Sequence, residues 1–300
     1  MHTEAAPSLL VQPVHDRTLY VGGSDVPALL GISPWKNKVD LWFEKTSMSP
    51  APDVSNPKAK ARGSRLEPYV RDMIAEEFGL EILRYNTRYI DPDVPYFAAE
   101  IDFETADANG EIKTSMFGGK QWGAEGTDEL PLHYIAQVQW GMGVNGARKC
   151  LVYALIGDDL KPYTVHRDDE LIYAMRGLAH EFWNEYVLKG QRPPIEHSHD
   201  TTIQTLRRLY PGTNGETIEA SQSQCAWRTV IEEAQGALLA YEKVVNTAKA
   251  HLMEEMGEAS ILAFPDGKGY VRKKIQRKGY SVEATEYMEF KLYKMKGGDA

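Results

Sequence analysis

Hydrophobic and polar residues interleave along residues 95–115, and this pattern predicts a β-hairpin. The stretch reads PYFAAEIDFETADANGEIKTS, with apolar and β-branched residues alternating with polar ones on both sides of a polar segment. Residues 106–110 form that segment, and Asp, Asn and Gly are residues that tight turns favour. We therefore expect two short strands joined by a turn.

Along the rest of the chain, the spacing of apolar residues changes repeatedly between helical and extended patterns. The expected helices cover residues 24–31, 39–46, 64–78, 132–144, 168–188, 202–210 and 222–256, and the further expected strands cover residues 80–90, 150–155, 163–167 and 260–264. Helices and strands mixed in this order predict an α/β fold.

A break in the pattern at residues 190–200 divides the expected fold. The segment GQRPPIEHSHD contains two prolines and two histidines and is typical of a linker. We expect a core domain over residues 1–195 and a C-terminal extension over residues 196–300. The extension would hold the long helix and a second hairpin with an Asp-Gly turn.

The first hairpin brings charged side chains together. Strand side chains alternate between two faces, so Glu111 and Lys113 point the same way and Ile112 points to the opposite side. The turn brings Asp102, on the incoming strand, near this pair. The pattern therefore places two carboxylates and one ammonium group at one spot.

These residue types suit a divalent metal site, although they also suit a solvent-exposed salt bridge. Hard cations such as Mg²⁺ prefer oxygen ligands, and the carbonyl oxygen of Ile112 is a further candidate. Lys113 would hold a hydroxide or neutralise charge on a phosphate. A metal site of this kind beside a lysine would suit a nuclease. Because an E-x-K motif is short and common, this interpretation needs more support than the motif gives.

Two other segments carry alternative interpretations. Ser64 and Glu67 have the spacing of a capping box, with Pro68 in the first turn of the helix, but Glu67 would also reach a metal site. Ser24 is expected to cap the short helix that follows it, yet with Arg17 it would also bind a phosphate there.

Amide and aromatic side chains extend the candidate site. Gln137 and Gln139 cannot face the same way on a helix, so one of them is expected to face inward and to need a polar partner. Trp35 follows a Pro turn; packing inward is the usual role of such an aromatic, and stacking on a base is the alternative.

Composition narrows the function classes. The formal net charge of −9 argues against a protein that coats nucleic acid non-specifically. Basic residues nevertheless cluster in residues 58–65 and 268–278, each of which is either a DNA-binding surface or a solvated face. Two cysteines without C-x-x-C spacing support neither a disulfide framework nor a zinc site. With no leader pattern and no long apolar run, we expect a cytoplasmic protein without a membrane segment.

Several of these motifs, in order, resemble the YqaJ-type viral recombinase family, which includes lambda exonuclease and belongs to the PD-(D/E)XK nuclease superfamily. The resemblance covers about residues 17–195. It is carried by Arg17, Gly22-Gly23-Ser24-Asp25, Gly63-Ser64-Arg65-Leu66-Glu67-Pro68, Asp102, Glu111-Ile112-Lys113 and Tyr134-Ile135-Ala136-Gln137-Val138-Gln139.

The resemblance implies a restriction-endonuclease-like core, with a mixed central sheet flanked by helices, and a Mg²⁺- or Mn²⁺-dependent exonuclease. Such an enzyme degrades the 5′-terminated strand of duplex DNA ends in a bacterial or phage-infected cell. The exposed 3′ strands then serve recombination by strand annealing. Family members form rings around DNA, which implies a homo-oligomer. The role in strand annealing implies a single-strand annealing protein as partner.

The same resemblance assigns the residues. Asp102, Glu111 and the Ile112 carbonyl would bind the principal metal ion, and Glu67 would assist a second ion. Lys113 would hold the nucleophilic water, with support from Gln137. Arg17 and Ser24 match the positions that hold the terminal 5′-phosphate.

Two features depart from the family. Phe103 stands where a glycine often follows the metal-binding aspartate, and residues 201–300 exceed the compact lambda protein. An endonuclease of the same superfamily and an inactive DNA-end-binding module remain the alternative functions.

Overall fold

The computed structural model describes residues 16–48, 57–116, 121–276 and 290–291. The chain divides into two compact units, residues 1–211 and 212–300. Each unit has its own secondary structure, and the candidate site lies wholly in the first.

A five-stranded mixed sheet forms the centre of the first unit. Its order is β1 (Arg84–Ile90), β2 (Ala98–Glu104), β3 (Asn109–Ser115), β4 (Lys149–Ile156) and β5 (Asp159–His166). Strands β3 and β4 are parallel, and every other neighbouring pair is antiparallel. The predicted α/β fold with a mixed central sheet is confirmed, as is the hairpin of β2 and β3.

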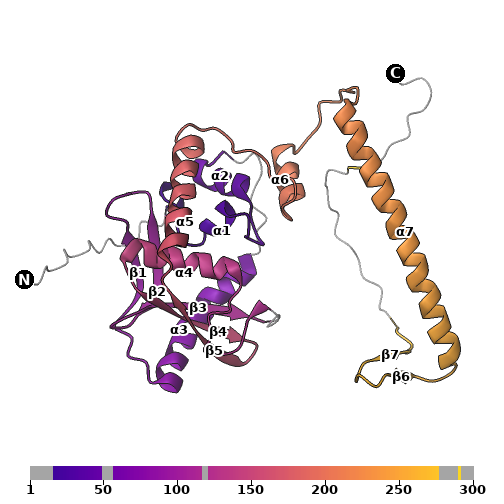
Figure 1. Cartoon of the computed structure of the whole chain (residues 1–300), viewed down its shortest axis with the longest axis horizontal. Coiled ribbons are helices and arrows are strands. Elements are labelled where there is room, and N and C mark those ends of the chain that lie inside the picture. Colours follow the sequence, from indigo (N-terminus) through magenta and orange to yellow (C-terminus); the bar gives the residue numbers. More distant parts are fainter. Residues whose placement is uncertain (1–15, 49–56, 117–120, 277–289, 292–300) are drawn as a thin grey trace, which may run out of the picture. The chain divides into compact units, whose positions relative to one another are not determined.

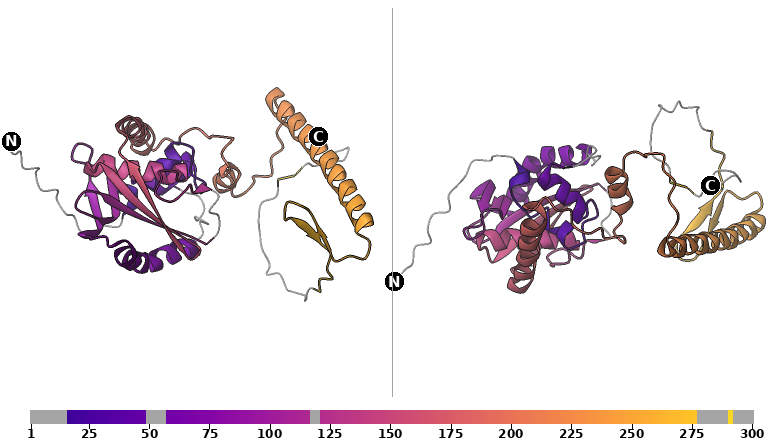
Figure 2. Two further views of the ribbon diagram at one scale, coloured as in Figure 1. Left: turned by 60° about the horizontal axis from the view of Figure 1, so that its bottom comes forward. Right: turned by 90° about the horizontal axis from the view of Figure 1, so that it is seen from above.

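Helices cover both faces of the sheet (Figures 1 and 2). Helix α4 (Leu132–Asn145) packs on one face, together with α1 (Val26–Leu29) and α5 (Asp169–Glu181), and α3 (Pro57–Phe78) packs on the other. Each face therefore has its own apolar cluster, the larger on the α4 side. The alternation of strand side chains sends Glu111 and Lys113 towards α4, and Ile112 into the cluster beneath α3.

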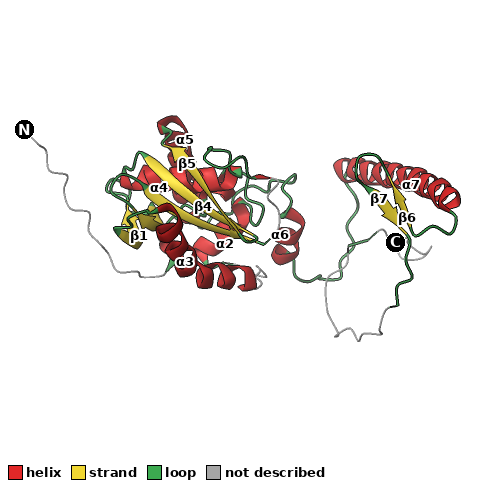
Figure 3. Ribbon diagram, turned by 90° about the horizontal axis from the view of Figure 1, so that it is seen from below, coloured by secondary structure: helices red, strands yellow, loops and turns green. Residues whose placement is uncertain are grey.

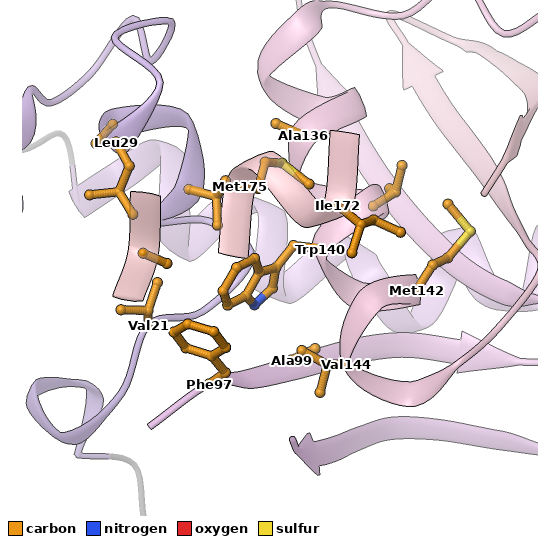
Figure 4. Close-up of a cluster of buried hydrophobic side chains, with 14 of the residues drawn as sticks. Val21, Leu29, Phe97, Ala99, Ala136, Trp140, Met142, Val144, Ile172 and Met175 are labelled. Carbon is orange, nitrogen blue, oxygen red and sulfur yellow. The ribbon is translucent and has the colours of Figure 1, made fainter. Parts of the chain in front are cut away.

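Trp140 fixes α4 on the sheet (Figure 4). Its ring is fully buried and lies 4.8 Å from the ring of Phe97, measured between centroids, and its Nε1 donates a hydrogen bond of 2.9 Å to the carbonyl of Ala98. This contact between α4 and β2 sets the position of Gln137, almost one turn earlier on the same helix.

Helix α3 differs from its prediction. It begins at Pro57, so Pro68 lies in the helix interior and Ser64 is not the N-cap. The capping-box interpretation of Ser64 and Glu67 is therefore wrong. Residues 58–65 are mostly Lys, Ala and Arg, which are strong helix formers, and they extend the helix upstream of the apolar periodicity.

The first unit extends past residue 195 because α6 (Thr202–Leu209) is tied to α2 (Lys38–Thr46). The Asn37 amide, which precedes α2, donates to the hydroxyls of Thr201 (3.0 Å) and Thr205 (2.7 Å). Arg208 also forms an ion pair with the buried Asp40. These contacts place α6, expected in the extension, with the core, and the two units divide at residue 211.

The second unit consists of a long helix and a hairpin (Figure 3). Helix α7 (Gln222–Met256) spans 35 residues, and β6 (Ile261–Ala263) pairs antiparallel with β7 (Gly269–Val271). Both elements match their predictions. Within the described part of the chain, no helix is long and apolar enough to cross a membrane.

Candidate active site

A local irregularity in β2 positions Asp102. The ladder between β1 and β2 pairs Thr87 with Ile101 and Tyr85 with Phe103 but skips Asn86, which would face Asp102 and has a φ of 51°. Asn adopts this left-handed conformation more readily than most residues. As a result Ile101 packs with the α4-side cluster and Phe103 with the α3-side cluster, although they are two residues apart.

The irregularity turns the Asp102 carboxylate towards β3, where its Oδ2 accepts a hydrogen bond of 2.7 Å from the backbone N–H of Ile112. The N–H and C=O of one strand residue face the same neighbour, so the carbonyl of Ile112 faces this side of β3 as well.

Phe103, which replaces the usual glycine, is accommodated by a glycine on the neighbouring strand. Gly110 pairs with Phe103 across the hairpin, and the Phe103 ring lies so close that a Cβ on residue 110 would come within 2.3 Å of three ring atoms. The bulky ring therefore fits without moving the adjacent Asp102.

Glu111, Lys113 and Gln137 form a closed hydrogen-bonded triangle. The Lys113 ammonium donates to Oε1 of Glu111 at 2.5 Å and to Oε1 of Gln137 at 3.0 Å. The Gln137 amide donates to the same Glu111 oxygen at 2.7 Å. Gln137 is thus the amide that faces the site. Gln139 is buried on another side of the helix and bonds the backbone of His166 and Asp168.

The surroundings of this group raise the pKa of both Asp102 and Lys113. Burial, and next the charge of Glu111, raise the pKa of Asp102 well above its ordinary value. Burial opposes the charge of Lys113, but Glu111 and Asp102 outweigh it and raise the pKa of the ammonium. The positive charge near Asp102 therefore does not offset the cost of ionising its buried carboxyl group.

Glu67 adds a third carboxyl from α3. Burial raises its pKa, Arg71 lowers it, and its side chain is hydrogen-bonded to Asn86, the residue opposite Asp102. The charge of Glu67 also contributes to the raised pKa of Asp102. Asn86, which the sequence analysis did not single out, thus connects the second predicted metal-binding carboxylate to the irregular point in the sheet.

The donors fit a hard divalent cation in chemical type, but they are not arranged as a finished ligand cage. Asp102, Glu111, Glu67 and the Ile112 carbonyl are all oxygen donors, and their mutual repulsion would be relieved by a cation. In the described residues, however, no three His, Cys, Asp or Glu side chains are grouped closely enough to hold an ion. One oxygen of Glu111 is occupied by Lys113 and Gln137 instead.

A second charged group surrounds Asp25, which is fully buried. Its carboxylate accepts hydrogen bonds from Lys36 at 2.9 Å and Lys45 at 2.7 Å and lies 3.6 Å from the Arg17 guanidinium. Burial opposes ionisation, but the charges of Lys36, Lys45 and Arg17 lower the pKa of Asp25 below its ordinary value. Lys36 also forms an ion pair of 2.7 Å with Glu44, so three cations and two carboxylates leave this pocket with an excess of one positive charge.

Ser24 belongs to this pocket and is not a helix cap. The N-cap position of α1 is Asp25, and the Ser24 hydroxyl accepts a hydrogen bond of 2.5 Å from the Arg17 guanidinium. The expected cap is therefore wrong, whereas the expected proximity of Arg17 and Ser24 is present. Lys36 and Lys45 have no sequence signal, because only the fold brings residues 17, 25, 36 and 45 together.

One cavity connects the two charged groups. It has a volume of about 110 Å³. Its polar lining includes Arg17, Ser24, Asp102, Glu111 and Gln137. Residues more than a hundred positions apart in the sequence thus line one cavity.

Aromatic rings line the approach to Lys113. The Tyr134 ring lies 4.8 Å from the Lys113 ammonium, and Trp35 and His133 contact each other beside it. Burial and the Lys113 charge lower the pKa of His133 to about 4, so this ring is neutral at physiological pH. Trp35 is 65% exposed, so its expected packing into the core is wrong.

The two basic runs lie on different units. Residues 58–65 belong to α3 and residues 268–276 to the hairpin region of the second unit, while Arg277 and Lys278 lie outside the described residues. Lys268 forms an ion pair with Asp266, and Arg272 bonds the carbonyl of Gly257.

Comparison with known proteins gives matches over the whole candidate site. The family model of the YqaJ-like viral recombinase domain matches residues 14–148. The uncharacterized protein YqaJ of Bacillus subtilis strain 168 is 30% identical over 254 residues, which cover 80% of this chain and 77% of that protein. This match is longer than the first unit, so it continues into the second.

Solved structures of similar fold include two exonucleases. An alkaline exonuclease from Laribacter hongkongensis is 19% identical with a TM-score of 0.45, and the overlap covers 58% of this chain and 90% of that chain. A phage-related exonuclease from Haemophilus somnus 129PT is 14% identical with a TM-score of 0.41, and the overlap covers 58% and 97%.

Proposed function

Because the chain belongs to the YqaJ-like viral recombinase family, we propose that it is a metal-dependent nuclease that degrades the 5′-terminated strand at the ends of duplex DNA. The observation that carries this proposal is the cavity shared by Arg17 and Ser24 at one side and Asp102 and Glu111 at the other. A cationic pocket beside a carboxylate group suits a strand whose 5′-phosphate is held while a neighbouring phosphodiester is cleaved.

The residues of the β2–β3 hairpin and α3 would hold the metal ions. Asp102, Glu111 and the Ile112 carbonyl would bind the principal Mg²⁺ or Mn²⁺, and Glu67 would assist a second ion. Bound divalent ions lower the pKa of water and stabilise the attacking and leaving oxygens of an in-line displacement.

The chain's own polar groups would orient the reacting phosphate. Lys113 is fixed by Glu111 and Gln137, so its ammonium is positioned before the substrate arrives. A fixed charge of this kind stabilises the negative charge that develops on the phosphate and needs little reorganisation during the reaction. Gln137 would keep both Glu111 and Lys113 in place.

The pocket around Asp25 would select the strand end. A terminal 5′-phosphate carries more charge than an internal phosphodiester, so the cations Arg17, Lys36 and Lys45 would favour it. Ser24 adds a hydroxyl donor. This selection distinguishes the exonuclease from an endonuclease of the same superfamily.

We further propose that the enzyme is a homo-oligomer that supplies 3′ single strands to an annealing protein. Support for self-association comes from α7, whose apolar residues are spaced alternately by four and three. The series is Trp227, Ile231, Ala234, Leu238, Tyr241, Val245, Ala248 and Leu252. Such heptad spacing is typical of helices that pair with other helices. The basic residues near β7 would contact the duplex.

The test uses linear duplex DNA labelled separately at each end, with either a 5′-phosphate or a 5′-hydroxyl, in Mg²⁺ or EDTA. We expect metal-dependent loss of the 5′ strand, leaving 3′ overhangs, and no cleavage of a closed circular duplex. Cutting of the circle would favour the endonuclease. Binding to ends without cleavage in Mg²⁺ or Mn²⁺ would favour the inactive module.

Arg17→Ala tests the phosphate pocket in the same assay. We expect this variant to lose the preference for phosphorylated ends while it still cleaves hydroxyl ends. Arg84→Ala, which removes an exposed arginine on β1, is the matched control and should keep the preference. Equal loss on both kinds of end in Arg17→Ala would contradict the assigned pocket.

A further inference from the structure

Trp35 is an exposed aromatic residue that is held on a rigid turn beside the candidate site. Its backbone N–H and that of Lys36 both lie 3.3 Å from the buried hydroxyl of Ser33, which accepts their hydrogen bonds. The N–H of Ser33 in turn bonds the carbonyl of Pro27 at 3.1 Å. The turn is therefore anchored to α1, although the indole itself is largely open to solvent.

The Trp35 indole lies beside residues that reach each of the two charged groups. On one side, the next residue, Lys36, reaches Asp25 in the cationic pocket. On the other side, the indole makes an edge contact with His133, with ring centroids 4.9 Å apart, and lies 6.3 Å from the Tyr134 ring. Tyr134 in turn contacts the Lys113 ammonium.

The size of the cavity determines which part of a nucleotide enters it. At about 110 Å³ it is smaller than the roughly 300–1,000 Å³ of pockets that enclose small organic ligands. It has room for phosphate groups and water, and its lining is charged and polar. The base of a nucleotide whose 5′-phosphate enters the cavity at Arg17 must therefore lie outside the cavity.

We propose that Trp35 is the stacking site for the base of the 5′-terminal nucleotide, an inference that rests on the proposed exonuclease function. Every base presents a flat π face, so stacking on an indole binds all four bases without sequence readout. Contact with His133 and Tyr134 keeps the indole in place, and the neutral His133 ring adds no competing charge. The ligand of this site is a nucleobase joined to a 5′-phosphate.

The first experiment measures stacking without cleavage. A duplex with 2-aminopurine as its 5′-phosphorylated terminal base is bound in EDTA, because stacking quenches the fluorescence of this base. We expect quenching by the wild type and by Trp35→Phe, and its loss in Trp35→Ala under saturating protein. Tyr173→Ala, which removes another exposed aromatic residue, from α5, is the matched control and should quench normally. Equal quenching by the wild type and Trp35→Ala, or none by the wild type, would overturn the proposal.

The second experiment measures release of the first nucleotide in Mg²⁺. The substrates are a normal phosphorylated end and an end whose first residue is an abasic sugar phosphate. We expect the wild type to release the normal nucleotide about tenfold more efficiently, since stacking on an aromatic side chain contributes on this order. Trp35→Ala should lower the normal rate to the abasic rate and leave the abasic rate unchanged. An equal decrease on both substrates would overturn the stacking role.

These two measurements separate the stacking proposal from the exonuclease proposal. If the wild type releases no nucleotide from any end, the exonuclease proposal fails, and the quenching in EDTA still decides whether Trp35 stacks on a base. If release is normal and independent of the terminal base, the exonuclease proposal stands and the stacking proposal fails.

Discussion

At the scale of single residues, Lys113 is the side chain whose removal should affect cleavage most directly. We expect Lys113→Ala to lower the rate of nucleotide release by about 10²- to 10³-fold, because loss of one positioned charge or donor in an active site has effects of this size. Duplex binding should change little, whereas the melting temperature should fall, because the buried Glu111 carboxylate loses its ammonium partner. Single-turnover kinetics and thermal melting of the same sample measure both.

Lys149→Ala is the control for this change. Lys149 also lies on the central sheet, but its ammonium pairs with the exposed Asp107 at the hairpin turn and is not part of the cavity lining. The Lys149→Ala variant should cleave at the wild-type rate. A Lys113→Ala variant as active as Lys149→Ala would remove Lys113 from the reaction.

Asp102 should destabilise the metal-free protein. Its folded pKa is raised, chiefly by burial and then by Glu111, so the folded state retains a proton that the unfolded state releases. The free energy of unfolding therefore falls as the pH rises from the ordinary aspartate pKa through the raised folded value. We expect Asp102→Asn to melt at a higher temperature than the wild type in EDTA at pH 8, by about 2–4 °C per kcal/mol gained.

Added Mg²⁺ should reverse this order. The cation stabilises the folded state of the ionised wild type much more than that of Asp102→Asn. The difference in melting temperature should therefore shrink or change sign. Asp107→Asn, at an exposed aspartate whose pKa is lowered chiefly by its hydrogen bond with Lys149, should gain nothing in EDTA. A melting temperature of Asp102→Asn below that of the wild type in EDTA would contradict the inference that the Asp102 charge destabilises the metal-free fold.

At the scale of elements, the β2–β3 hairpin depends on the contact between Phe103 and Gly110. We expect Gly110→Ala to destabilise the first unit by about 1–3 kcal/mol, because the added methyl group would overlap the buried ring. The Asp102 carboxylate would be displaced with it, so cleavage should fall as well. Chemical denaturation and the release assay measure the two effects.

The double variant Gly110→Ala/Phe103→Leu should recover part of the loss, since the smaller side chain leaves room for the methyl group. Gly177→Ala is the control: this glycine lies in α5 with open space around its Cβ position, so alanine should be neutral or slightly stabilising. Additive effects in the double variant would show that the two positions do not interact.

The elements that the sequence predicted well are those with local signals. The alternation in residues 95–115 fixed the hairpin and the common face of Glu111 and Lys113. The skipped pairing at Asn86 was not predictable, because it depends on how β1 meets β2. Helix α3 is longer than predicted for a related reason: a proline such as Pro68 usually marks the first turn, whereas packing of the apolar stripe keeps this helix continuous around it.

The candidate site was predicted in part for the same reason. Asp102, Glu111 and Lys113 are close in the sequence and share one hairpin, so strand geometry alone relates them. Lys36 and Lys45 join Asp25 only through the packing of α1 against α2, and no spacing rule relates them.

At the scale of the whole molecule, α7 should determine the number of copies in the assembly. We expect Leu238→Lys/Val245→Lys to lower the oligomeric state measured by light scattering after size exclusion, because charges at these heptad positions oppose helix pairing. Release of the first nucleotide should persist, since both residues lie in the second unit. Glu233→Lys/Thr247→Lys, at positions off the heptad series, should leave the oligomeric state unchanged. A wild-type mass in the first variant would exclude α7 as the assembly helix.

The tie between α6 and α2 has a consequence for how such chains can be shortened or recombined. Helix α2 carries Lys45 and begins two residues after Lys36, and the buried polar groups of Asn37 and Asp40 at its start are hydrogen-bonded by Thr201 and Thr205. A fragment that ends at residue 195 would leave Asn37 and Asp40 without these partners, which destabilises a fold when the groups are buried. A fragment that ends at residue 211 would keep them. A junction for exchanging C-terminal segments between relatives should therefore lie downstream of Pro211.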